Sequence, residues 1–438
     1  MGARPATPHL RAMHLSYRLL ASHCVMLLLG AGGALPGSAR AEAPQRTAYT
    51  LIVANNASLD PKQADLRYAD DDGARYYELL APQSQQAVLL SVLDAETQER
   101  HPGLAARTRP PTRAALLEAL QGLNARMAAD KAAGHIPVLY FIFTGHGQRG
   151  AAGEGSVSLL DGPFSRTDLY KQVIAPSTAG LLHLIVDACD SYFFVNSRGA
   201  LPVGPALGSA VTQHLASREL ERYPHVGVVL STSKAQESHE WSAISAGVFS
   251  HQVRSALAGA ADVNADGRVE YSELMAFIAS ASQGVEDVRG RLDIFARPPL
   301  LDRSAALSDL AQKSGLGYLL IPEGQGGRMW VEDTRGVRLA EFHKERERAL
   351  VLGLPSGRGY YLRTPGQEAR FTVTQGREVV DAGGLSWTAL SVASRGALED
   401  AFRDHLFSVA FGPRFYSGYV ASTGAAPVTL YPGPDLSP

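Results

Sequence analysis

Two residues of the chain can support nucleophilic catalysis. Cys189 directly follows the apolar run 182–188, and His146 lies just beyond the apolar run 136–144. A cysteine attacks as its thiolate, and a neighbouring imidazolium lowers the pKa of the thiol and later protonates the leaving amine. Gly147 lets its backbone N–H approach a substrate carbonyl and, with the N–H of Cys189, would form an oxyanion hole. These residue types predict nucleophilic attack by Cys189 on a substrate carbonyl.

The cysteine count also bears on this prediction. The chain has two cysteines, Cys24 and Cys189, and Cys24 lies in a segment that we expect export to remove. An unpaired thiol in an exported protein indicates an intermolecular bridge or a reactive group. Free cysteine is also common as a small buried apolar residue. The residues around Cys189 favour the reactive group.

Residues 1–41 have the composition of a secretory signal. Arg11 and Arg18 precede the apolar stretch 19–35, and small residues follow up to Ala41. This order is typical of a signal peptide, whereas a spanning helix, the alternative, needs ~20 mostly apolar residues. We expect cleavage after Ala41, export to the periplasm or the medium, and no transmembrane segment in the mature chain.

The candidate residues need a scaffold that brings two strand ends together. Apolar runs that indicate strands alternate with stretches that indicate helices. The strands are expected at 49–55, 87–93, 136–144, 182–188 and 225–231, and the first helices at 70–81 and 111–127. Near-continuous apolar strands separated by helices predict an α/β fold with a mostly parallel sheet flanked by helices. In such sheets active groups gather beyond the carboxyl ends of the strands.

Short motifs stand in a characteristic order between residues 49 and 282. They are ADDDGA (69–74), the strand-end His-Gly (146–147), the strand-end Asp-Ala-Cys (187–189), STSKAQESHEW (231–241) and GVFSHQVRSALAG (247–259). In this order and context they resemble the caspase–metacaspase superfamily. In caspases the histidine precedes the cysteine by about 50 residues, and here the gap is 189 − 146 = 43 residues. The resemblance implies a cysteine endopeptidase with His146 and Cys189 as its dyad, acting on proteins or peptides.

The resemblance also implies a specificity pocket. Asp187 falls where metacaspase-like members place an acidic residue of that pocket, and Asp72 looks like its second acid. Two converging carboxylates prefer a cation, which implies Arg or Lys before the scissile bond. For Asp72 the alternative is a helix cap. Ser231 ends the last predicted strand, Ser233 comes two residues later, and both are expected to line the substrate groove.

Some residues depart from the family pattern. Asp190 follows the cysteine, and Tyr192 stands where many relatives have glycine. A carboxylate beside a thiol opposes its ionisation, so the alternative is a catalytically inactive, calcium-dependent protein-binding module. Residues 231–234 match S-x-x-K of penicillin-recognising enzymes, but the partner motifs of those enzymes are missing. His183 and His251 fall inside a strand and a helix, where a structural role is expected.

Residues 262–273 match the twelve-residue loop of an EF-hand position by position. Gly267 supplies the sharp turn, and helical patterns at 247–260 and 272–281 flank the loop. The calcium ligands would be Asp262, Asn264, Asp266, Arg268 through its carbonyl, Glu270 through a water and Glu273 as a bidentate carboxylate. A lone hand of this kind predicts a weak Ca²⁺ site, on the order of 10⁻⁴–10⁻³ M. The alternative is a polar turn that only resembles such a loop.

The 438-residue length predicts two or three domains. A net charge of −2 excludes the basic surface of a nucleic-acid-binding protein. Beyond residue 316, short strands separated by Gly and Pro predict a small antiparallel sandwich, and the aromatic run 407–419 predicts a strand or flap. The division is a signal peptide (1–41), a caspase-like domain (47–282), a linker (283–316), a β-sandwich-like domain (317–393) and a C-terminal tail (394–438). Nothing in the sequence selects a partner for the sandwich.

Overall fold

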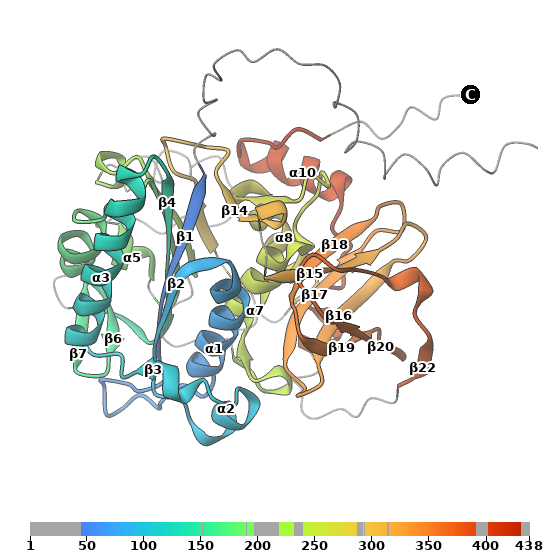
Figure 1. Cartoon of the computed structure of the whole chain (residues 1–438), viewed down its shortest axis with the longest axis horizontal. Helices are drawn as coiled ribbons and strands as arrows, with labels where there is room; N and C mark the ends of the chain where they lie inside the picture. Colours follow the sequence, from blue (N-terminus) through green and yellow to red (C-terminus); the bar gives the residue numbers. More distant parts are fainter. Residues whose placement is uncertain are drawn as a thin grey trace, which may run out of the picture. The chain divides into compact units, whose positions relative to one another are not determined.

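The computed structural model describes residues 45–150, 153–189, 191–196, 219–231, 240–286, 292, 294–312, 315–390 and 402–430 (Figure 1). The expected signal peptide, Asp190 and Ser233 lie outside these residues. Across the described ranges, no helix combines the length and the apolar character that a membrane crossing needs.

A seven-stranded sheet organises the N-terminal half, in the order β13-β9-β8-β4-β1-β2-β3. All neighbours are parallel except β13 and β9, which are antiparallel. The strands are β1 (Arg46–Asn55), β2 (Ser84–Leu90), β3 (Thr108–Arg109), β4 (Ile136–Gly145), β8 (Leu181–Asp187), β9 (Val226–Ser231) and β13 (Ile294–Arg297). The predicted mostly parallel sheet is therefore confirmed.

The sheet is buried on both faces. In β1, Leu51 and Val53 pack into one hydrophobic cluster, and Ile52 and Ala54 pack into another. Alternate side chains of a strand point to opposite faces, so each cluster covers one face. A sheet covered on both faces needs apolar residues at successive positions. This requirement explains the continuous apolar runs of the sequence.

Helices cover both faces of the sheet (Figure 1). Side chains of α1, α7 and α8 join the cluster of Ile52, and those of α3 and α5 join the cluster of Leu51. The helices are α1 (Ala69–Leu80), α2 (Ala95–Arg100), α3 (Arg113–Ala132), α4 (Arg166–Asp168), α5 (Ser191–Val195), α7 (Val248–Ser255, continued as a π-helix over Ala256–Ala260) and α8 (Tyr271–Ser282). Helix α3 begins after Thr112, whose hydroxyl accepts the Ala115 N–H at 3.2 Å.

A small antiparallel sheet begins at the predicted site. It comprises β5 (Gly147–Arg149), β6 (Gly155–Leu159) and β7 (Gly162–Ser165). The N–H of Ser158 donates to the carbonyl of His146 at 2.9 Å. The turn that carries His146 is therefore held by backbone hydrogen bonding. The sequence analysis did not foresee these strands, because they are short and rich in glycine.

The C-terminal half contains antiparallel sheets, as expected. One has the order β18-β15-β21 and the other β17-β16-β19-β20-β22, and only β15 and β21 pair in parallel. The strands are β15 (Leu316–Ile321), β16 (Gly327–Asp333), β17 (Arg338–Lys344), β18 (Leu350–Pro355), β19 (Arg358–Arg363), β20 (Gln367–Val373), β21 (Val379–Asp381) and β22 (Trp387–Ala389). We call these strands the C-terminal β region.

The C-terminal β region shares a hydrophobic core with the main sheet. Leu319 and Val331 belong to the same cluster as Ile52. The segment expected as a linker contains two strands, β13 at the edge of the main sheet and β14 (Ala306–Asp309), which pairs with β12 (Arg268–Glu270). The remaining short strands, β10 (Glu240–Trp241) and β11 (Ala246–Gly247), form a hairpin.

The aromatic run of the tail differs from its prediction. A strand or flap was expected over 407–419, but residues Pro413–Thr423 form helix α10. Pro413 occupies the first turn, where its fixed φ suits a helix. Gly424 ends the helix with φ at +67°, a left-handed conformation that glycine adopts at little cost. The strand prediction is therefore wrong for these residues.

Candidate functional site

His146 and Cys189 follow neighbouring parallel strands. β4 and β8 pair along their length, and Thr144 and Asp187 are their last paired residues. A Cβ on Gly147 would lie 2.0 Å from the carbonyl oxygen of Cys189. The backbones of Gly147 and Cys189 are therefore in direct contact, closer than any side chain at position 147 would allow. The structure therefore brings the backbones of Gly147 and Cys189 together at the carboxyl ends of β4 and β8, and His146 directly precedes Gly147.

The imidazole of His146 has the surroundings of a neutral base. The side chain is buried, and Nε2 has no hydrogen-bond partner among the described residues. The backbone of Ala64 favours the protonated ring through a hydrogen bond. Burial lowers the pKa of His146, and the nearby Asp65 opposes this effect. Sequence reasoning missed Ala64, because it contributes through its backbone and has no residue signature.

The turn after β8 carries Cys189 at a half-buried position. The hydroxyl of Ser191 donates to the carbonyl of Ser231, which joins this turn to the end of β9. Tyr192 is fully buried and packs edge-on against Phe295, with ring centroids 5.4 Å apart. The tyrosine therefore occupies the core. Asp190 lies outside the described residues, and its effect on the thiol stays a prediction.

The predicted acids Asp72 and Asp187 converge on Gly247. A Cβ at Gly247 would lie 2.9 Å from Oδ2 of Asp72 and 3.1 Å from Oδ2 of Asp187. Asp72 comes from α1 and Asp187 from the end of β8, so residues 115 positions apart meet here (187 − 72 = 115). Because Asp187 stands two residues before Cys189, this acidic pair lies next to the candidate nucleophile.

Asp72 has two partners on the neighbouring helix. Its Oδ1 binds Nη1 of Arg254 at 2.6 Å, and its Oδ2 accepts the N–H of Gly247 at 2.8 Å. The helix-cap alternative does not describe this carboxylate, because both oxygens bind the segment around α7 rather than the start of α1. Burial raises the pKa of Asp72, and Arg254 and Arg75 oppose this effect. Because arginine keeps its proton, the ionised carboxylate is the form that compensates Arg254.

Asp187 has a different environment. Its Oδ2 accepts the hydroxyl of Ser250 at 2.6 Å and the N–H of Ser250 at 3.2 Å. The side chain is half-buried. Burial and the neighbouring Asp72 raise the pKa of Asp187 to about 7. This carboxyl therefore titrates near neutral pH and gains from a cation placed beside it.

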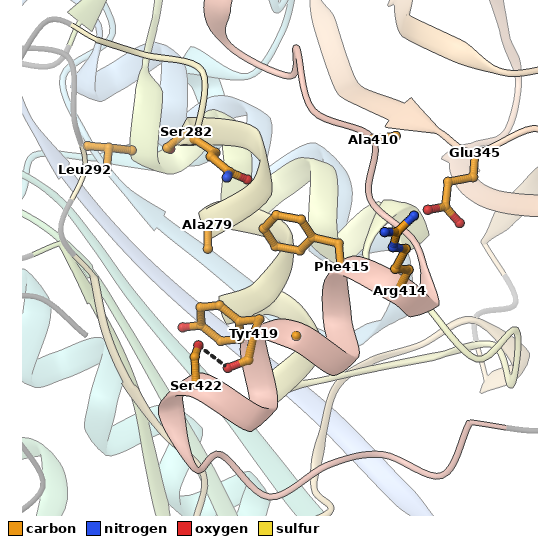
Figure 2. Close-up of a pocket in the computed structure, with 11 residues that line it drawn as sticks. Ala279, Ser282, Leu292, Glu345, Ala410, Arg414, Phe415, Tyr419 and Ser422 are labelled. Atoms are coloured by element: carbon orange, nitrogen blue, oxygen red, sulfur yellow. Dashed lines mark hydrogen bonds between the residues drawn. The ribbon is translucent and has the colours of Figure 1, made fainter. Parts of the chain in front are cut away.

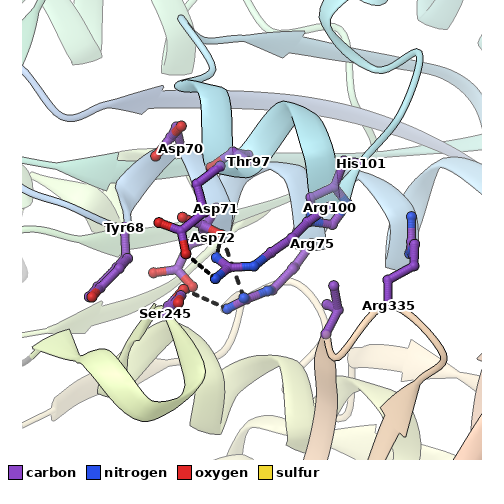
Figure 3. Close-up of polar contacts among 12 residues, drawn as sticks. Tyr68, Asp70, Asp71, Asp72, Arg75, Thr97, Arg100, His101, Ser245 and Arg335 are labelled. Atoms are coloured by element: carbon purple, nitrogen blue, oxygen red, sulfur yellow. Dashed lines mark hydrogen bonds and ion pairs between the residues drawn. The ribbon is translucent and has the colours of Figure 1, made fainter.

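The other acids of α1 have structural partners. Asp70 accepts hydrogen bonds from the Asn56 amide at 2.7 Å and the Asp94 N–H at 2.9 Å. Asp71 lies between Arg100, at 3.1 Å, and Arg75, at 3.6 Å (Figure 3). These ion pairs fasten α1 to the residues around it.

Two residues of the acidic cluster, Ser250 and Arg254, were not predicted. Both lie in GVFSHQVRSALAG, and with Gly247 their spacing is i, i+3 and i+7. This spacing places them on one face of α7. An arginine on that face of an otherwise apolar helix was the signal that could have revealed them, because buried arginine requires a partner.

The 262–273 loop has the turn of an EF-hand but not its open carboxylates. Gly267 has φ at +79°, and its N–H donates to Oδ2 of Asp262 at 2.9 Å. The Glu273 carboxylate accepts the N–H groups of Val263 at 3.0 Å and Glu270 at 2.8 Å. Within the described ranges, no group of three or more acidic, histidine or cysteine side chains is arranged to hold a metal. The loop fits calcium in residue type and turn, and Glu273 would have to leave these amides to bind it.

The remaining predicted residues are placed as follows. Ser231 is buried at the end of β9, where it pairs with Ile294 of β13. His183 binds the Tyr271 hydroxyl at 2.7 Å, and His251 lies 3.3 Å from Glu341. Both histidines are buried and have structural partners.

A separate groove of about 820 Å³ lies between α8 and α10 (Figure 2). Ser282, Leu292, Glu345, Arg414, Phe415 and Tyr419 are among its lining residues. None of the predicted catalytic or specificity residues lines it. The groove is therefore not part of the site around Cys189.

Comparisons with known proteins add little to this geometry. No family model matches the chain, and no curated protein matches it. Among solved structures, a structural-genomics target from Geobacter sulfurreducens is 16% identical to this chain. That match covers 48% of this chain and 80% of the other, with a TM-score of 0.23. A likeness of this degree carries no argument about function.

Proposed function

We propose that the chain is an exported cysteine endopeptidase of caspase or metacaspase type, with Cys189 as nucleophile and His146 as base. One observation carries the proposal: the His146–Gly147 turn lies against the backbone of Cys189 at the ends of adjacent parallel strands. A nucleophile, a histidine and close backbone N–H groups at one point are the components of acyl transfer.

The chemistry follows from these components. Nε2 of His146 takes the proton of the Cys189 thiol, and the thiolate attacks the scissile carbonyl carbon. The N–H groups of Gly147 and Cys189 stabilise the oxyanion. The tetrahedral intermediate collapses as His146 returns the proton to the leaving amine, which gives a thioester. Water then attacks the thioester, with His146 again as base, and releases the acid and the free thiol.

We further propose that the substrate carries Lys or Arg before the scissile bond. Asp187 supports this specificity, because it is a half-buried carboxylate two residues from the nucleophile. A cation beside it is favoured by charge-assisted hydrogen bonding. Calcium bound through the 262–273 loop is proposed as a modulator only, since Glu273 binds backbone amides in this structure.

The test is cleavage of fluorogenic peptides by residues 42–438. Cys189→Ala and His146→Ala should each reduce turnover at least ~10³-fold, because removing one member of a cooperating dyad costs about as much as removing both. His225→Asn is the matched control, because His225 lies at the opposite end of the sheet, just before β9. Near-wild-type turnover by either dyad variant, with the fold intact, rejects the assignment.

A further inference from the structure

Arg254 supplies the acidic cluster with a cation of its own. It is 1% exposed, and its guanidinium lies 2.6 Å from Oδ1 of Asp72 and 5.2 Å from the Tyr76 ring centroid. The other oxygen of Asp72 is taken by the N–H of Gly247. Both oxygens of Asp72 are therefore engaged before any substrate arrives.

The carboxylate of Asp187 has only one of its two oxygens engaged by the described residues. Ser250 engages only its Oδ2, and Oδ1 accepts no hydrogen bond from the part of the chain that the structure describes. The side chain keeps a half-buried position, whereas Asp72 is 1% exposed. Asp72 forms an ion pair with Arg254, whereas Asp187 forms no ion pair with the residues that the structure describes.

We infer that Asp187 alone, rather than the Asp72–Asp187 pair, binds the cationic side chain before the scissile bond. Asp72 does not bind this side chain, because its carboxylate is already paired with Arg254. The inference rests on the proposed function and narrows its specificity. Ser250 becomes a positioning residue, because its hydroxyl and its N–H fix the orientation of the Asp187 carboxylate.

The number of free carboxylate oxygens decides which cation the pocket prefers. A guanidinium outbinds an ammonium where it can form two parallel hydrogen bonds to a carboxylate. One free oxygen removes this advantage. The pocket should therefore take lysine at least as well as arginine.

The experiment uses three fluorogenic peptides that differ only in lysine, arginine or norleucine before the scissile bond. The wild type should cleave the lysine peptide with a kcat/KM equal to or above that of the arginine peptide. Asp187→Asn should lower kcat/KM for both basic peptides roughly 10- to 100-fold, the worth of one charge-assisted hydrogen bond, and leave the norleucine peptide within about threefold.

A double variant separates the two acids. Asp72→Asn with Arg254→Met removes both members of the buried pair, a change that buried ion pairs tolerate better than loss of one partner. The double variant should keep the preference for lysine over norleucine. A tenfold or larger loss of that preference, or a tenfold wild-type preference for arginine over lysine, overturns the inference. Either result would show that both acids bind the substrate cation.

Gly247→Ala crowds both carboxylates of the same pocket. The φ of Gly247 is −67°, which alanine adopts freely, and the added methyl would stand 2.9 Å from Oδ2 of Asp72 and 3.1 Å from Oδ2 of Asp187. Cleavage of both basic peptides should fall relative to norleucine, and an unchanged ratio overturns the inference. If the wild type cleaves norleucine as well as lysine, the inference fails alone. If it cleaves none of the three peptides, the proposed function fails with it.

Discussion

Two groups of acidic residues, one around Asp72 and Asp187 and the other in the 262–273 loop, are neutralised by different means. Around Asp72 and Asp187, the compensating charge is a buried guanidinium, Arg254. In the 262–273 loop, the carboxyls of Asp262 and Glu273 accept hydrogen bonds from backbone N–H groups, and the nearby guanidinium of Arg348 donates to the carbonyl of Asp262 rather than to either carboxyl. A guanidinium bonded to a carboxylate cancels its charge, whereas dipoles leave the charge in place.

This difference separates what each cluster can do. Burial raises the pKa of Glu273 to about 8 and that of Asp262 to about 6. The carboxyls of Asp262 and Glu273 are therefore partly protonated in the folded protein, and a bound cation would displace these protons. The cluster around Asp72 and Asp187 has its own cation, Arg254, and in our proposal Asp187 is left to bind the cation of a substrate.

The largest effect on stability should come from removing Arg254, the cation of the cluster around Asp72 and Asp187. Arg254→Met leaves Asp72 buried without its counter-ion, and breaking a buried pair costs about 3–5 kcal/mol. Urea unfolding measures this loss. Adding Asp72→Asn should restore a large part of it, because the uncompensated charge is then gone. A single variant as stable as the wild type would show that Arg254 does not compensate Asp72.

The second effect is a pH dependence of stability that belongs to the loop. The pKa of Glu273 is raised from 4.5 to about 8 in the folded protein, so between these values the folded state holds a proton that the unfolded state has lost. Without calcium, the contribution of Glu273 to the free energy of unfolding should therefore be greatest below about pH 4.5 and should fall as the pH rises toward 8. The slope is at most about 1.4 kcal/mol per pH unit.

Glu273→Gln isolates this contribution. The variant loses the titrating group, so its free energy of unfolding should depend less on pH across that window, whatever its absolute stability. Urea unfolding between pH 5 and 8 with a chelator measures both slopes. Equal slopes in the two proteins would show that Glu273 is ionised in the folded state and that hydrogen bonds from backbone amides stabilise the ionised carboxylate.

The sequence predicted the main sheet because each strand is buried on both faces. Hydrophobic runs such as 136–144 are long enough to identify without structural information, and the ends of those strands then place His146 and Cys189. The two-residue hairpin strands and β13 carry too few apolar residues to be recognised. β13 has four residues and is followed directly by Pro298 and Pro299, which indicated a linker.

The partners of the site residues were harder to predict. Asp72 and Asp187 were identified through their motifs, but nothing in a single sequence indicates that Arg254 of α7 binds Asp72 of α1. Such a contact depends on the packing of α1 against α7. The same limit applies to Ala64, which binds His146 through its backbone. It also applies to Glu273, because its hydrogen bonds to the N–H groups of Val263 and Glu270 depend on a side-chain rotamer.

The smallest expected effect concerns calcium. A cation bound by the 262–273 loop should stabilise the fold by RT ln(1 + [L]/Kd), which is about 1.4 kcal/mol at ten times Kd. Millimolar calcium should therefore raise the melting temperature of residues 42–438 by a few degrees. Glu273→Gln should remove the increase, whereas Glu323→Gln, a change at an exposed acid of the C-terminal β region, should retain it. Magnesium at the same concentration controls for ionic strength. Calorimetric titration without heat at several millimolar calcium would reduce the loop to a polar turn, in which backbone N–H groups donate to the carboxyls of Asp262 and Glu273.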